Sequence, residues 1–165
     1  MEDGLKLTKP MDMRDVEPYI REAIAAGGSV CVRVKGSSMW PFLVNGRDSV
    51  FFEALPKRSL RSGDILLYLR KNGRYVMHRL YAVEKDGSLT FVGDNQNNLE
   101  HGIAADQLIA YANRFIRNGK RLYCSRSLLN RFMILYMKMR IRLPKTTQFL
   151  IDTAVKLKHI GEKKA

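Results

Sequence analysis

The chain has 165 residues, which is the length of one domain that can bury a hydrophobic core without disulfide or metal staples. Its 29 lysines and arginines against 16 aspartates and glutamates give a net charge of +13, so a polyanion, either nucleic acid or acidic lipid, is an expected partner. The charge is concentrated near the C-terminus, because residues 117–165 hold 13 Lys and Arg against only Asp152 and Glu162, a net of +11.

The cysteines and histidines give no basis for a metal site or a disulfide framework. Cys31 and Cys124 are far apart in the sequence, form no Cys-x-x-Cys motif and have no histidine beside them at the spacing of metal ligands. We therefore expect reduced, buried thiols, no metal and no cofactor.

No targeting or membrane-spanning segment is expected. The first residues lack the apolar stretch of a secretory signal, and the densest apolar run, Phe132–Met137, is far shorter than the about 18 residues that span a bilayer. The sequence predicts a cytoplasmic protein, with peripheral attachment to a membrane as an alternative.

The first predicted element is one short amphipathic helix from about Asp12 to Ala26. Asp12 or Asp15 is a candidate N-cap, and the pair Gly27-Gly28 is a stop signal. Apolar side chains recur at helical spacing within it, at Val16, Tyr19, Ile20, Ala23 and Ile24.

The pattern then changes to short β-rich runs separated by Gly, Asn and Asp. The sequences KNGR (71–74) and KDGS (85–88) are typical hairpin loops, because Asn-Gly and Asp-Gly tolerate the positive φ that such turns need. This block predicts a small, mainly antiparallel β domain, with strands at 29–34, 49–52, 64–69, 75–84, 89–92 and 108–117.

The last part of the chain is helical by pattern. One apolar stripe is formed by Leu128, Leu129, Phe132, Met133 and Tyr136, and after a break at Pro144 a second is formed by Leu150, Ile151, Ala154, Val155 and Leu157. The expected fold class is α+β, mainly β, with a helical segment at 1–28, a β domain at 29–123 and a cationic helical extension at 124–165.

Two adjacent serines, Ser37 and Ser38, lie in the sequence GSSMWP between a predicted strand and a turn. A serine hydroxyl becomes a good nucleophile only when a neighbouring base takes its proton. Of His78, His101 and His159, only His78 lies inside a predicted strand, where a rigid backbone could aim it, with Arg79 on the opposite face. An unperturbed imidazole base would make cleavage rise through about pH 6 to 7.5.

Four short motifs occur in one order: GSSMWP (36–41), GDILLY (63–68), HRLYAV (78–83) and GDNQN (93–97). In this the sequence resembles the superfamily of type I signal peptidases and LexA-type self-cleaving proteins, which are serine peptidases on a mostly β fold. The resemblance covers roughly residues 30–121. Within this superfamily the sequence is similar to the archaeal and endoplasmic-reticulum signal peptidases, which have histidine as the base where bacterial signal peptidases have lysine.

The resemblance implies roles for particular residues. Ser38 precedes the methionine and is the implied nucleophile, His78 is the general base, and Asp94 is the implied partner of the histidine. Asp64 is the implied structural support of the site. Many signal peptidases have a second oxyanion-stabilising serine where this chain has Gly36, which leaves the Ser38 N–H and Ser37 as candidate donors.

Apolar residues follow the implied nucleophile directly. Met39, Trp40 and Pro41 are candidate substrate-groove residues, and an ordinary core that also contains Phe42 and Leu43 is the alternative.

The leading hypothesis is therefore a serine endopeptidase that cuts a peptide or a precursor protein. One alternative is a LexA-type protein that cleaves itself, for which Ala26-Gly27 is a candidate site. Another is a non-enzymatic nucleic-acid-binding protein using the basic tail, but aromatic residues are sparse after Tyr136, and broad apolar faces with cations favour packing or an anionic membrane surface over nucleic acid.

Overall fold

The computed structural model describes residues 5–6, 12–124 and 128–143. Within them the chain is mainly antiparallel β with two α-helices, α1 (Met13–Ala25) and α2 (Leu128–Arg142), which confirms the predicted α+β, mainly β class. The strands are β1 (Leu5–Lys6), β2 (Val30–Arg33), β3 (Ser49–Glu53), β4 (Ile65–Leu69), β5 (Tyr75–Val83), β6 (Leu89–Val92), β7 (Glu100–Ile103), β8 (Leu108–Arg117) and β9 (Lys120–Tyr123).

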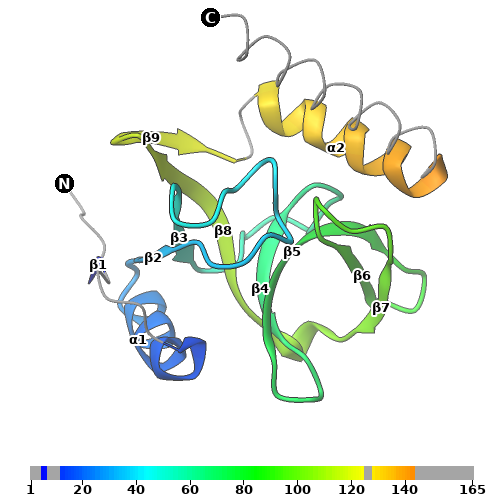
Figure 1. The fold of residues 1–165 in the computed structure, drawn as a ribbon. Helices are drawn as coiled ribbons and strands as arrows, with labels where there is room; N and C mark the ends of the chain where they lie inside the picture. Colours follow the sequence, from blue (N-terminus) through cyan, green and yellow to red (C-terminus); the bar gives the residue numbers. More distant parts are fainter. Residues whose placement is uncertain (1–4, 7–11, 125–127, 144–165) are drawn as a thin grey trace, which may run out of the picture.

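All of these strands belong to one sheet in the order β1-β2-β3-β8-β4-β5-β6-β7, with β9 paired to β8. The two-residue β1 is parallel to β2, and the other pairs are antiparallel. Figure 1 shows that the sheet is strongly curled and that α1 and α2 lie toward opposite ends of it. The curl brings the loop after β2 close to β5.

The six predicted strands are confirmed, whereas β1, β7 and β9 were not predicted. In β9 all four residues are exposed, and β7 contains a glycine and only one buried side chain, Ile103. Such strands carry no alternating apolar pattern, because they are held by backbone pairing to β6 and β8 rather than by burial of a face.

Helix α1 starts and ends as its sequence predicts. The Asp12 side chain accepts a hydrogen bond from the N–H of Arg14, which satisfies one free donor of the first turn. Gly27 has φ of 76°, the left-handed conformation that ends helices. Val16 and Ile20 are buried against the sheet, but Tyr19 is exposed.

Both predicted hairpin loops are present. KNGR joins β4 to β5 and KDGS joins β5 to β6, and in each loop the glycine adopts positive φ. The first of these hairpins orients β5, which carries His78, against β4.

The core consists of two apolar clusters. The larger one lies between α1, the loop after β2, and strands β2, β3, β4 and β8, and it includes Phe42, Leu43 and Phe115. The smaller one includes Tyr68, Leu80 and Phe91. Cys31 and Cys124 are both buried, as predicted.

Helix α2 packs on the domain by one face. Met133 and Met137 are each 2% exposed, and Met133 belongs to the larger cluster. Gly63 has φ of 100°, and a Cβ there would overlap the side chain of Ile134. The second predicted tail helix, with Leu150 and Leu157, lies outside the described residues. Within the described part of the chain, neither helix has the length and apolarity to cross a membrane.

Candidate active site

Ser38 and His78 lie on different elements but line the same pocket, of about 270 Å³. Ser38 lies in the loop between β2 and β3, and His78 lies in the middle of β5. Lys35, Arg70 and Gln96 line the pocket with them. In the described part of the chain the serine hydroxyl and the imidazole are not hydrogen-bonded to each other, and catalytic contacts of this kind commonly tighten only when substrate binds.

The loop that carries Ser38 is held by the Gly-Asp-Asn motif. The N–H of Asn95 donates to the Ser38 carbonyl oxygen at 2.7 Å. A Cβ added at Gly93 would lie 2.7 Å from that same oxygen, so only glycine fits at this position without displacing the loop. The first and fourth motifs of the sequence are therefore in direct contact, and the fourth one positions the candidate nucleophile.

His78 is buried, and its Nδ1 faces a tyrosine and a carboxylate. The Tyr68 hydroxyl lies 3.3 Å from Nδ1 and donates its proton to Glu100 Oε2 at 2.8 Å. Because the Tyr68 hydroxyl already donates its proton to Glu100, it cannot also donate to Nδ1. The contact is a hydrogen bond when Nδ1 carries its own proton and donates to the Tyr68 oxygen. The other nitrogen, Nε2, then has the lone pair that a general base needs.

Glu100 is fixed in turn by Arg70. The Arg70 guanidinium donates to both carboxylate oxygens, at 2.7 and 2.6 Å. Although burial opposes ionisation, these bonds and the one from Tyr68 keep the pKa of Glu100 below its usual range. Glu100 is therefore ionised at neutral pH, and its Oε2 lies 3.9 Å from His78 Nδ1, where it can stabilise a positive imidazolium.

The surroundings of His78 keep the imidazole neutral. Burial and then the positive charge of Arg70 lower the pKa of His78 from 6.5 to about 4, and the charge of Glu100 only partly opposes this. Burial also raises the pKa of the Tyr68 hydroxyl, as does its bond to Glu100, so that Tyr68 stays protonated. At neutral pH the pocket is therefore lined by a neutral histidine and a serine.

This lowered pKa revises the pH dependence expected from the sequence. If neutral His78 is the base, kcat/KM should rise through about pH 4, the pKa of the free protein's histidine, and be flat from about pH 5.5 upward. Peptide cleavage measured between pH 3.5 and 8, with circular dichroism to establish the range of the folded state, checks this. A half-maximal rise between pH 6 and 7.5 would contradict the burial argument.

Asp94, the implied partner of the histidine, is instead paired with Arg79. Its two carboxylate oxygens accept from Arg79 at 2.7 and 2.8 Å, and both side chains are 0% exposed. His78 and Arg79 are consecutive in β5 and so point to opposite faces of the sheet. The structure thus places Asp94 with Arg79, and Tyr68 and Glu100 occupy the position beside His78 Nδ1.

The remaining candidate residues are placed as follows. Asp64 accepts from Arg58 at 2.7 and 2.8 Å and from the N–H of Arg61, a structural role away from the serine. Ser37 is exposed, and its carbonyl oxygen accepts from the N–H of Trp40. Among the described residues no group accepts from the Ser38 N–H, so this donor is available for an oxyanion.

The three candidate groove residues differ in their environment. Met39 is 2% exposed and belongs both to the core and to the lining of the serine pocket. Trp40 and Pro41, joined by a cis peptide bond, are exposed and lie outside the lining of that pocket.

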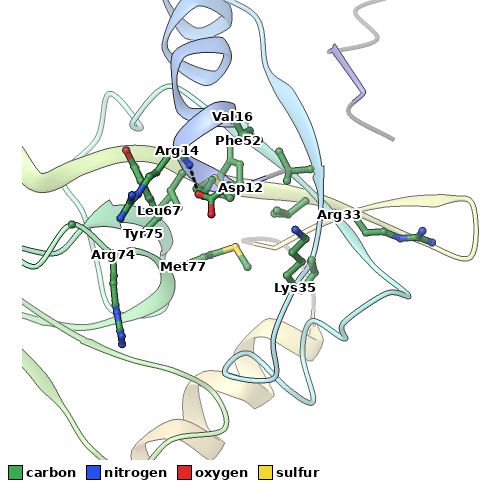
Figure 2. A pocket seen from close by; sticks show the side chains of 15 residues that line it. Asp12, Arg14, Val16, Arg33, Lys35, Phe52, Leu67, Arg74, Tyr75 and Met77 are labelled. Atoms are coloured by element: carbon green, nitrogen blue, oxygen red, sulfur yellow. Dashed lines mark hydrogen bonds between the residues drawn. The ribbon is translucent and has the colours of Figure 1, made fainter. Parts of the chain in front are cut away.

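A second cavity, of about 590 Å³, opens beside the serine pocket and shares with it Val34, Lys35, Tyr75 and Met77. Figure 2 shows Val16, Phe52, Leu67 and Met77 around its interior, while Arg33 and Arg74 extend outward. The two cavities form one depression that runs from the candidate nucleophile to the start of α1. The interior of the larger cavity is mainly apolar, the serine pocket is mainly polar, and cations lie on the border together with Asp12.

Sequence reasoning missed Tyr68, Arg70, Glu100 and Gln96. Gln96 could have been found, because it lies within the GDNQN motif (93–97). The described residues hold no group of three or more His, Cys, Asp or Glu side chains that could bind a metal ion. No protein-family model matches the chain, and no curated protein sequence is significantly similar to it.

Proposed function

We propose that the protein is a serine endopeptidase of the signal-peptidase and LexA-like type, with Ser38 as nucleophile and His78 as general base. The observation that carries the proposal is the shared pocket of Ser38 and His78, in which Nδ1–H of His78 donates a hydrogen bond to the Tyr68 hydroxyl oxygen and Nε2 is left as the basic nitrogen. The order of the four sequence motifs supports the same reading, since two of them meet at the Ser38 carbonyl.

The chemistry follows the usual course of a serine peptidase. Ser38 Oγ attacks the scissile carbonyl carbon while His78 Nε2 takes its proton, and the Ser38 N–H donates to the oxyanion. His78 then gives the proton to the leaving amine, which leaves an acyl ester on Ser38. A water molecule, deprotonated by His78, hydrolyses the ester, and His78 returns that proton to Ser38 Oγ as the acid product leaves. Glu100, acting across Tyr68, stabilises the imidazolium in both steps.

The substrate in this proposal is an extended peptide. Strand β5 pairs with β4 from Tyr75 to Arg79 but with β6 only from Arg79 onward, so the second edge of residues 75–78 has no strand partner among the described residues. A peptide can bind such an edge through its backbone. Its side chains would then enter the depression beside Ser38, which becomes apolar toward the start of α1.

Self-cleavage at Ala26-Gly27 receives no support from the geometry. The N–H groups of Ala26, Gly27 and Gly28 all donate to carbonyl oxygens of α1, at 3.0, 3.0 and 2.7 Å. The peptide bond between Ala26 and Gly27 is therefore part of the helix end, and its cleavage would first require the last turn of α1 to unfold.

The proposal is tested with a fluorophosphonate probe, which esterifies activated serines. The wild-type protein should be labelled, Ser38→Ala should not, and Ser37→Ala is the matched control that should retain labelling. His78→Gln should slow labelling about a hundredfold or more, because the hydroxyl loses its base. Labelling that persists in Ser38→Ala would remove the peptidase assignment.

A further inference from the structure

Helix α2 has two opposite faces, of which the domain covers only one. The covered face consists of Asn130, Met133, Met137 and Arg140, all of them buried. On the other side lies the exposed stripe of α2, which we define as Leu128, Phe132, Leu135 and Met139; Leu128 is 80% exposed and Phe132 is 63% exposed. These residues recur at intervals of four, three and four, so they form one continuous strip along the helix.

Cations flank this exposed stripe along one side. Arg131, Lys138 and Arg142 are exposed and, by helical spacing, lie together next to the stripe. No acidic residue occurs in α2, and the segment from residue 117 to the C-terminus carries a net charge of +11. An apolar strip bordered by cations complements a surface that is apolar inside and anionic outside.

We propose that the exposed stripe of α2 inserts into the interface of an anionic lipid bilayer, with Arg131, Lys138 and Arg142 against the lipid phosphates. Large exposed apolar side chains gather on this helix, and a contiguous patch of that kind marks an interaction surface. Each cation near an anionic membrane strengthens binding about fivefold. Helix α2 lies on the surface in the bilayer plane and does not cross it.

The covered face of α2 connects this docking surface to the serine loop. Arg140 donates to the Asn97 side chain at 2.6 Å and to the backbone carbonyl oxygens of Asp94 and Asn95 at 3.4 Å. Asn95 in turn donates to the Ser38 carbonyl oxygen. A bilayer bound to the outer face of α2 would therefore hold the serine pocket at a fixed distance from the membrane.

The test is co-sedimentation of the full chain with vesicles of phosphatidylcholine, alone or mixed with phosphatidylglycerol. The wild type should bind the mixed vesicles, bind phosphatidylcholine at least tenfold more weakly, and be released by high salt. The double variant Phe132→Gln/Leu135→Gln should lose at least tenfold in vesicle affinity, whereas Leu55→Gln/Val83→Gln, the same change at exposed residues away from α2, should not. The double variant Arg131→Gln/Lys138→Gln should lose more vesicle affinity than Lys71→Gln/Lys85→Gln, which removes the same charge away from α2.

Insertion is measured separately with Phe132→Trp. Its fluorescence should shift to the blue and be quenched by brominated lipid on mixed vesicles, beyond any change in the wild type, whose only tryptophan is Trp40. Ser38→Ala should bind vesicles like the wild type, so that loss of the peptidase proposal leaves this one standing. The membrane proposal would be overturned if the wild type did not bind vesicles. It would also be overturned if the stripe variants changed only the oligomeric state in sedimentation velocity. The exposed stripe would then be assigned to another occupant, such as residues 144–165 or a second copy of the chain.

Discussion

Replacing His78 with glutamine should lower kcat by about a thousandfold or more while the protein stays folded. The proposed role of His78 is to move one proton from Ser38 to the leaving amine, and positioned proton transfer contributes about two to four orders of magnitude to a rate. Glutamine fills much of the same volume and still offers a donor to the Tyr68 hydroxyl, so the buried contact at 3.3 Å is retained in kind. The measurement is single-turnover cleavage of a peptide substrate.

The matched control is His101→Gln, the same substitution at an exposed histidine whose Nδ1 contacts Thr90 at 3.0 Å. It should cleave at the wild-type rate. Tyr68→Phe tests the orienting group in the same assay: it preserves the stacking on Phe91, at 4.6 Å, but removes the acceptor for Nδ1–H, so kcat should fall about tenfold to a hundredfold. Normal turnover by His78→Gln would show that the base lies elsewhere.

The two ends of the proposed proton transfer could be predicted from the sequence because each has a local signal. Ser38 lies in a distinctive loop sequence, and His78 is the one histidine in a predicted strand. Their meeting in one pocket depends on the curl of the sheet, which no local pattern specifies. The strand predictions succeeded for the same local reason, since each predicted strand buries side chains on at least one face.

The group that orients His78 could not be found in this way. Tyr68 lies on β4, where it ends the GDILLY motif without any role being implied for it, and Glu100 lies on β7 outside the four motifs. Glu100 also reaches the site on a strand that the apolar pattern does not reveal. The resemblance instead suggested Asp94, which lies close in the chain to Gly93 but binds Arg79 on the opposite face of β5.

The pKa of His78 depends on burial and on Arg70, which are properties of the folded chain. A sequence gives only the unperturbed imidazole value of about 6.5. Burial lowers it to about 4, which decides the pH range of the proposed activity. In the same way, sequence periodicity found the apolar residues of the tail but could not separate those of α2 that pack on the domain from those that remain exposed.

The substitution with the largest expected effect on stability is Asp94→Asn. Among the described residues, Asp94 is the only negatively charged group that contacts the buried guanidinium of Arg79. The other hydrogen bonds of this guanidinium go to the neutral oxygens of Gly63 and Asn130. Removing one partner of a buried ion pair leaves an uncompensated charge, which typically costs about 3–5 kcal/mol in the free energy of unfolding. Urea unfolding followed by circular dichroism measures this loss.

Asp106→Asn is the matched control, because Asp106 is exposed, and its free energy of unfolding should remain close to that of the wild type. The double variant Arg79→Met/Asp94→Leu separates the pair from the packing around it, since it removes both charges together and should be more stable than Asp94→Asn. A loss below about 1 kcal/mol in Asp94→Asn would mean that water or another group satisfies Arg79. A large loss assigns Asp94 to the stability of the junction between β5, α2 and the serine loop, and gives a physical reason for its place beside Gly93 that requires no part in proton transfer.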